Sequence, residues 1–159
     1  MTIVAYGADT VQGQGIWPDL LVRGMLAVGM RQADTEGGMA ETRVFTDGTS
    51  LSELASLVGV FAGEDAMMVK LVVDTASGWI AAGAGMHFDE EQELLARGSR
   101  QEDLWGLNVY FDRPAGHPRR IVLESMINLR PPQHSSRIVE DPVIREAIMV
   151  VLESEVEGW

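Results

Sequence analysis

The sequence contains no cysteine. Disulfide bonds, thiolate nucleophiles and thiolate metal sites are therefore excluded, and the composition is compatible with a reducing cytoplasm, where we expect the protein to reside. Lysine is scarce as well, because Lys70 is the only lysine among 12 basic residues, against 24 acidic residues and a net charge of -12. A protein with this net negative charge repels the phosphate backbone of nucleic acids, so we expect no general nucleic-acid binding. A local arginine cluster could still hold a small anion.

Long apolar runs are also missing. The best candidate, residues 15–30, is interrupted by Pro18, Asp19 and Arg23. It falls short of the roughly 20 apolar residues that span a membrane, and it lacks the basic start of a signal peptide. We therefore expect no membrane helix and no secretion signal. The phosphate-binding glycine loops, the HExxH zinc motif and the GxSxG nucleophile motif are absent too, so the sequence predicts no cofactor.

The length of 159 residues fits one domain. Residues 1–42 differ from the rest, because Gly-rich polar segments flank one short apolar stretch, Trp17–Met30. We predict an N-terminal arm with a short helix over residues 1–42 and a single compact domain over residues 43–159.

Apolar periodicity predicts three helices and about five strands in the domain. Two pairs of consecutive strands are typical of hairpins, in which the two strands run antiparallel. The expected fold is therefore α+β, with a small antiparallel or mixed sheet and the order β-α-β-β-α-β-β-α. The predicted elements are a strand at 43–46, a helix at about 51–61 capped by Ser50 and Glu53, a hairpin of 67–75 and 79–85, a helix that begins after Asp89 and ends at Gly98, a hairpin of 103–111 and 119–129, and a helix that begins at Asp141 and Pro142.

A polar loop, INLRPPQHSSR at residues 127–137, follows the last predicted strand. Alternation along that strand delivers Asn128 and Arg130 to its polar face, and the stiff proline pair then presents Gln133 and Arg137. Together with Asn108 from the preceding strand, these residues could form a pocket for a carboxylate or phosphate. In the alternative interpretation, Arg130 pairs with an acidic residue and the loop merely links a strand to the last helix.

A second polar segment, GMHFDEEQ at residues 85–92, contains the candidate catalytic residue His87. His87 could act as a general base, with Asp89 either orienting it or, as is more typical, capping the helix. The acidic residues that follow predict a solvated helix face. We expect no metal site, because consecutive helical carboxylates point in different directions.

Several segments together resemble a small prokaryotic family of uncharacterised proteins, of the domain-of-unknown-function type. They are MVKLVVD, HFDEEQELLARGSRQEDLWGLNVY, SMINLRP with Gln133 after it, and EDPVIRE. The resemblance covers about residues 43–146. It implies a single compact α+β domain and supplies no activity.

The sequence thus predicts a domain that binds a small anionic ligand, with hydrolysis by His87 as an additional expectation. Whether the protein is an enzyme is left open. The alternative is a non-enzymatic interaction protein, a homo-oligomer or a partner-binding module, in which apolar surface of the C-terminal helix or of Trp17–Met30 packs against another copy or a partner. A homodimer through the C-terminal helix is one such arrangement. Met149 and Val150 favour this alternative, because they make the apolar stripe of that helix wider than one core-facing side requires.

Overall fold

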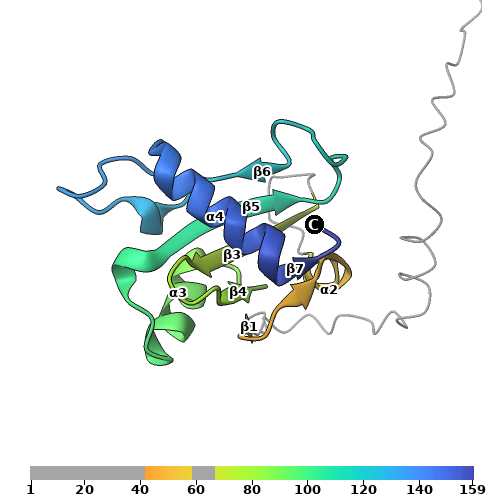
Figure 1. The fold of residues 1–159 in the computed structure, drawn as a ribbon, viewed down its shortest axis with the longest axis horizontal. Coiled ribbons are helices and arrows are strands. Elements are labelled where there is room, and N and C mark those ends of the chain that lie inside the picture. The colour runs from red at the N-terminus through yellow and green to blue at the C-terminus, as the bar shows by residue number, and fades with distance from the viewer. Residues whose placement is uncertain (1–41, 59–66) are drawn as a thin grey trace, which may run out of the picture. The chain divides into compact units, whose positions relative to one another are not determined.

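The computed structural model describes residues 42–58 and 67–159, and the predicted N-terminal arm lies outside them. Figure 1 shows the fold. Its elements are β1 (Arg43–Phe45), β2 (Thr49–Ser50), α2 (Leu51–Ala55), β3 (Met68–Asp74), β4 (Ile80–Ala82), α3 (His87–Ala96), the 3-10 helix η1 (Gln101–Asp103), β5 (Leu104–Tyr110), β6 (Ile121–Val122), the 3-10 helix η2 (Met126–Asn128), α4 (Pro142–Glu155) and β7 (Val156–Glu157).

A five-stranded antiparallel sheet forms the centre of the fold, with the strand order β1-β4-β3-β5-β6. The predicted α+β fold and both predicted hairpins are confirmed. β4 ends at Ala82, earlier than predicted, because Gly83 has a φ of +95° and leaves the strand conformation. β2 and β7 add a parallel pair with Thr49 opposite Val156. The sequence does not predict this pair, since strands of two residues leave no periodic pattern.

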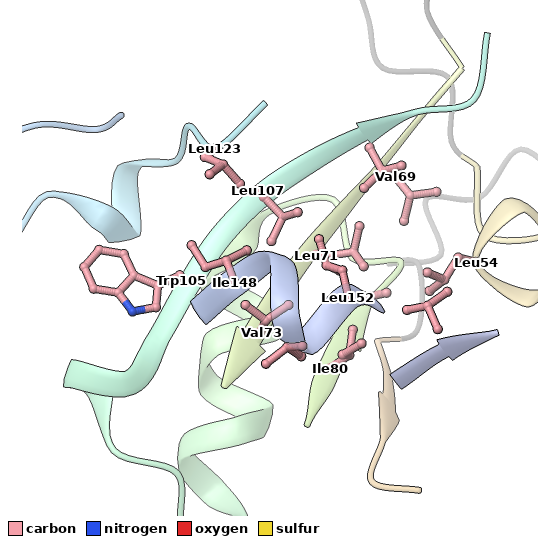
Figure 2. Packing of buried hydrophobic residues seen from close by; sticks show 14 of the residues in the cluster. Leu54, Val69, Leu71, Val73, Ile80, Trp105, Leu107, Leu123, Ile148 and Leu152 are labelled. Carbon is pink, nitrogen blue, oxygen red and sulfur yellow. The ribbon is translucent and has the colours of Figure 1, made fainter. Parts of the chain in front are cut away.

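One face of the sheet packs against α4 and forms the main hydrophobic core (Figure 2). Because side chains alternate along a strand, β5 sends Trp105, Leu107 and Val109 to this face. Ile148 and Leu152 of α4 meet them and are fully buried. Burying each such aliphatic side chain contributes roughly 1.5–3 kcal/mol, so α4 is a principal source of stability.

The opposite face of the sheet packs against α3, which lies on the other side from α4 in Figure 1. Val72, Ala81 and Leu104 of the sheet form a smaller core there with Leu94 of α3. This core is confined to one part of the face. Beyond it, the same face carries the polar side chains that make up the candidate site.

The predicted caps of two helices are correct, but one of these helices is shorter than expected. The Asp141 side chain accepts a hydrogen bond from the Val143 N–H at 2.8 Å, and α4 begins at Pro142 as predicted. The Ser50 hydroxyl accepts from the Glu53 N–H at 3.1 Å, yet α2 ends at Ala55. A tighter turn follows Ala55, and residues 59–61 of the predicted helix lie outside the described residues.

The predicted start of α3 is wrong and its predicted end is right. The N-cap is Met86, which has no capping side chain, and Asp89 lies within the first turn. A negative charge in the first turn stabilises a helix without capping it. At the other end, Gly98 has a φ of +103° and donates its N–H to the Leu95 carbonyl oxygen at 3.0 Å. Gly98 therefore terminates α3 in the way that glycine favours.

The last predicted strand, residues 119–129, is mostly wrong. Its regular part, β6, covers only Ile121–Val122. The chain then turns into η2, because the Ser125 hydroxyl accepts a hydrogen bond from the Ile127 N–H at 3.3 Å. As a result, Asn128 does not alternate outward along a strand but is fully buried.

Candidate functional site

The buried amide of Asn128 bonds to the backbone of β5. Its Oδ1 accepts from the Gly106 N–H at 2.9 Å, and its Nδ2 donates to the Gly106 carbonyl oxygen at 3.0 Å. Nδ2 also donates to the Arg137 carbonyl oxygen at 3.1 Å, which uses both of its hydrogens. Ser125 and Ile127, which precede Asn128 in the chain, pack closely against β5 because position 106 has no side chain. A Cβ there would lie only 2.6 Å from the Ser125 Cβ.

Arg130 likewise bonds to backbone carbonyl groups. Its Nε donates to the Ile127 carbonyl oxygen at 2.8 Å. Its two terminal nitrogens donate to the carbonyl oxygens of Gln101 and Leu104. The guanidinium carbon lies 4.7 Å from the centroid of the Trp105 ring, within the range of a cation–π contact. Arg130 therefore ties the loop after η2 to η1 and to the start of β5.

The rest of the polar loop divides between the interior and the surface. His134 donates from Nδ1 to the Asn128 carbonyl oxygen at 2.7 Å and contacts the edge of Trp105, with ring centroids 5.4 Å apart. Gln133 is exposed. The exposed Arg137 guanidinium lies 3.6 Å from the Glu124 carboxylate. The structure thus brings Asn128 and Arg130 together but leaves Gln133 and Arg137 outside this cluster.

His87 lies at the start of α3, next to Asn108 on β5. Its Nε2 is 2.8 Å from the Leu107 carbonyl oxygen. Because a carbonyl oxygen only accepts, Nε2 carries the hydrogen and Nδ1 holds the lone pair of the neutral ring. Burial lowers the pKa of His87 from 6.5 to about 4, with a further lowering by the charge of Lys70 and an opposing effect of the Leu107 bond. His87 is therefore neutral at physiological pH.

We expect His87 to make the folded state sensitive to acid. Between its unfolded pKa of 6.5 and its folded pKa of about 4, only the unfolded chain binds a proton at His87. Its contribution is complete above the unfolded pKa and falls by roughly 3 kcal/mol as the pH approaches the folded pKa. Urea unfolding across this range should show a weaker acid destabilisation for His87→Gln than for the wild type. His117→Gln, at an exposed histidine, is the matched control; parallel curves for all three proteins would contradict this role.

The acidic residues after His87 do not form the predicted solvated face, because Glu90 is fully buried and Glu91 is 4% exposed. Glu90 accepts from the Ala84 N–H at 3.1 Å through Oε1, whereas its Oε2 has no hydrogen-bond partner within the described residues. Burial holds the pKa of Glu90 well above its ordinary value. One signal in the sequence could have indicated this burial. Leu94 and Leu95 follow Glu90 and Glu91 by four residues each, so that each leucine lies on the same side of the helix as one of the glutamates.

A group of basic and polar side chains lies on the α3 side of the sheet, near the end of β5. Asn108 and Tyr110 point to this side, because they alternate with the β5 residues of the main core. Lys70 is opposite Asn108 on β3. The Arg120 carbonyl oxygen accepts from the Tyr110 N–H at 2.8 Å, and the Arg113 guanidinium carbon lies 3.8 Å from the Tyr110 ring centroid. We call these five residues the basic face: Lys70, Asn108, Tyr110, Arg113 and Arg120.

Two arginines of the basic face form no ion pair with an acidic residue among those that the structure describes. They are Arg113 and Arg120, and Arg113 donates to the Arg119 carbonyl oxygen instead. The backbone carbonyl of Glu124 accepts from Asn108 Nδ2 at 3.1 Å, but the Glu124 carboxylate faces Arg137. In a chain with a net charge of -12, arginines without carboxylate partners are available to an external anion.

The sequence predicts Asn108 and His87 as members of a site, but it does not predict the other residues of the basic face. Strand alternation does place Lys70 on the face opposite its neighbours Val69 and Leu71. The pairing of Lys70 with Asn108 depends on the register of β3 against β5. No turn between these two strands sets that register, because β4 and α3 come between them in the chain.

Comparison with known proteins gives a family but no activity. Residues 49–154, about two thirds of the chain, match the family DUF5674, described as a protein of unknown function. The resemblance to an uncharacterised domain family is thereby confirmed. No curated protein and no solved structure matches the chain. In residues 42–58 and 67–159, no helix has the length and apolar character needed to cross a membrane.

Proposed function

Because the chain belongs to the DUF5674 family, whose function is unknown, we propose a function from the geometry of the basic face. This face binds a small anionic ligand, a phosphate or carboxylate compound. The observation that supports the proposal best is the position of Arg113 and Arg120, without acidic partners among the described residues, on the same side of the sheet as Lys70. Guanidinium and ammonium groups form strong hydrogen bonds to both kinds of anion.

The negative charge of the whole protein does not prevent this binding. At physiological salt, charges separated by more than about 8 Å are largely screened. Many acidic side chains gather elsewhere, around a groove beside β2 and β7. They are Asp47, Glu53, Glu153, Glu155 and Glu157. These five carboxylates therefore have little influence on an anion bound at the basic face.

The loop at residues 127–137 offers fewer donors to a ligand than the basic face does. Both Nδ2 hydrogens of Asn128 and three nitrogens of Arg130 already bond to backbone carbonyl groups. An anion would have to displace these bonds and leave buried carbonyl groups unsatisfied, which costs about 1–3 kcal/mol for each group. The proposed site therefore keeps Asn108 and His87 from the sequence prediction and adds the cations of the basic face.

The pKa of His87 favours a binding function over hydrolysis. A general base is most effective when its pKa lies near the working pH, and burial lowers that of His87 to about 4. His87 contributes instead by its position, because its bond to the Leu107 carbonyl holds the start of α3 beside Asn108. Hydrolysis with His87 as the base stays a prediction, and comparing phosphate release from phosphate esters in the wild type and His87→Gln tests it.

Removing a cation from the basic face should weaken ligand binding. Phosphate, citrate and sugar phosphates can be screened for an increase in the free energy of unfolding, which reaches about 2.7 kcal/mol at a hundredfold excess over Kd. We expect Lys70→Gln and Arg113→Gln each to reduce this gain. Arg97→Gln is the matched control, because it removes one charge from an exposed arginine at the C-cap of α3. An equal loss in all three variants, or no gain for the wild type with any anion, would contradict the proposal.

One observation also favours the second candidate, an interaction protein that dimerises through α4. Val143 and Val150 are 75% and 53% exposed, although both are apolar. They are seven residues apart and so lie on one side of the helix. In an antiparallel pair of α4 helices with a two-fold axis near Ala147, Val143 of each copy would meet Val150 of the other. Met149, by contrast, packs against the main core.

Light scattering tests this second candidate. If α4 forms the interface, the wild type should be a dimer and Val150→Glu a monomer, because the introduced charge would be buried without a partner. Ile138→Glu makes the same kind of change at an exposed residue outside α4 and should leave the dimer intact. A monomeric wild type, or equal dissociation of both variants, would contradict dimerisation through α4.

A further inference from the structure

Lys70 lies between Asn108 and the place where Glu90 is anchored. On one side, Lys70 is directly opposite Asn108 of β5. On the other side, β4 ends opposite the residue that follows Lys70 in β3. Just beyond this end of β4, the Ala84 N–H donates to Glu90 Oε1 at 3.1 Å. Because β3 and β4 run antiparallel, the chain after β4 continues past Lys70. The Glu90 carboxyl group therefore lies beside Lys70, and the charge of Lys70 acts on it.

Glu90 has fewer hydrogen-bond partners than a buried carboxylate needs. Its side chain is fully buried, and its Oε2 has no hydrogen-bond partner among the residues that the structure describes. Ionising such a group is costly, so the neutral, protonated form is favoured. Burial raises the pKa of Glu90 well above its ordinary value, while the Ala84 bond and the charge of Lys70 lower it. The protonation of Glu90 is therefore sensitive to any change of charge at Lys70.

Other titratable groups near Glu90 belong to α3 and to the elements that pack against it. On α3 itself, His87 is neutral at physiological pH, and the charge of Asp89 raises the pKa of Glu90. The others are Glu91 and Glu93 of α3, Arg43 of β1, Asp74 of β3 and Tyr110 of β5. β4 and η2 contribute no titratable side chain. Lys70 is the cation that acts on Glu90.

The charge of the basic face depends on whether Glu90 carries a proton. Lys70, Arg113 and Arg120 are the cations of this face, and Asp112, next to Arg113 in the chain, offsets one of them. An ionised Glu90 offsets a second cation and repels an incoming anion, whereas a protonated Glu90 does neither. An anion bound beside Lys70 in turn disfavours the ionised carboxylate. The anion and the Glu90 carboxylate thus compete for the charge of Lys70.

We propose that a proton regulates the basic face, because anion binding there is coupled through Lys70 to protonation of Glu90. This inference rests on the proposed anion-binding function and adds its regulation. The coupling is reciprocal, so the proton increases the affinity for the anion by the same factor by which the anion increases the affinity for the proton. Glu90 is protonated below its raised pKa and ionised above it. The affinity for the anion should therefore be highest at low pH and fall as the pH rises through this pKa.

Calorimetric titration of the full chain with sulfate, between about pH 5.5 and about pH 8.5, tests this proposal. Sulfate is the probe because its own charge does not change in this range. We expect the affinity of the wild type to fall about fivefold or more from the low to the high end. Glu90→Gln is a neutral analogue of the protonated carboxyl group, so it should lose this fall and bind sulfate more tightly than the wild type at the high end. His117 is present in both proteins, so its effect cancels in the comparison.

Glu93→Gln is the matched control, because it makes the same change at an exposed residue of α3. It should keep the pH dependence of the wild type. Repeating the titrations in buffers with different ionisation enthalpies counts the protons taken up with each sulfate. The wild type and Glu93→Gln should take up more protons than Glu90→Gln, by up to about one.

The possible results separate this inference from the function on which it rests. Equal pH dependence and equal proton uptake in the wild type and Glu90→Gln would overturn the coupling and leave anion binding intact. If Glu90→Gln does not fold, the carboxyl carbon resonance of Glu90 in the wild type decides. Sulfate should raise the pH at which this carboxyl group ionises, and an unchanged titration would overturn the coupling. If sulfate does not bind at any pH, and phosphate and carboxylate compounds do not bind either, the proposed function itself fails.

Discussion

Asn128→Asp is expected to lower the free energy of unfolding by about 4 kcal/mol at neutral pH. The side chain is fully buried, and its Nδ2 donates to the carbonyl oxygens of Gly106 and Arg137. An aspartate would remove both donors and place a carboxylate oxygen against these two carbonyl oxygens. Because burial disfavours the charged carboxylate, part of the stability should return as the pH falls and the carboxyl group becomes a donor.

Gln133→Glu is the matched control for this change. It also converts an amide into a carboxylate, five residues away in the same loop, but Gln133 is exposed. Its effect on the free energy of unfolding should stay within about 0.5 kcal/mol. Urea unfolding followed by circular dichroism, at neutral pH and near pH 4, measures both variants. Equal losses of unfolding free energy for the two substitutions would contradict the conclusion that the hydrogen bonds of the buried Asn128 amide to β5 stabilise the fold.

Arg130→Ala is expected to cost about 3 kcal/mol of stability, because hydrogen bonds from a charged group contribute roughly 1.5–3 kcal/mol and this substitution leaves several acceptors unpaired. The acceptors are the carbonyl oxygens of Ile127, Gln101 and Leu104. Arg130→Lys should recover only part of the loss. A single ammonium group cannot reproduce the planar fork that reaches acceptors in different directions.

Arg137→Ala provides the comparison for Arg130, since both arginines belong to the same loop. The Arg137 side chain is 58% exposed and faces Glu124 at 3.6 Å, and such surface pairs contribute at most about 1 kcal/mol. Chemical denaturation together with a phosphate titration distinguishes two roles for Arg130. If Arg130→Ala kept its stability and lost phosphate binding, Arg130 would be a ligand-binding residue, as the sequence predicts. It would then not act mainly by hydrogen-bonding the loop after η2 to η1 and β5.

Local sequence signals predicted the parts of the fold that depend on neighbouring residues. Asp141 and Pro142 mark the start of α4, and Gly98 marks the end of α3, because a cap or a left-handed glycine acts within one helical turn. The strand hairpins were predicted for the same reason. Asp89 shows the limit of such signals. Its spacing from Gln92 fits a cap, yet α3 already begins at His87, because tertiary packing buries Glu90 and Glu91 against the sheet.

The candidate site was harder to predict because it depends on contacts between distant parts of the chain. Alternation placed Asn128 on the outer face of a strand, whereas the Ser125 cap turns the chain into η2 and buries the amide beside Gly106. Gly106 lies 22 residues before Asn128, and the close packing of Ser125 and Ile127 against it requires a position without a side chain. The basic face likewise arises from the pairing of Lys70 with Asn108. Periodicity assigns each residue to a face but does not say which strands are neighbours.

Nuclear magnetic resonance titration of the labelled protein with phosphate tests the central claim most directly, because it locates the binding surface. Anion binding at the basic face predicts that the largest amide shift changes occur around Lys70, from Asn108 to Arg113, and around Arg120. The first residues of α3 should respond as well, since His87 bonds to the residue before Asn108. Shift changes confined to residues 127–137, or no changes up to a high phosphate concentration, would contradict the account.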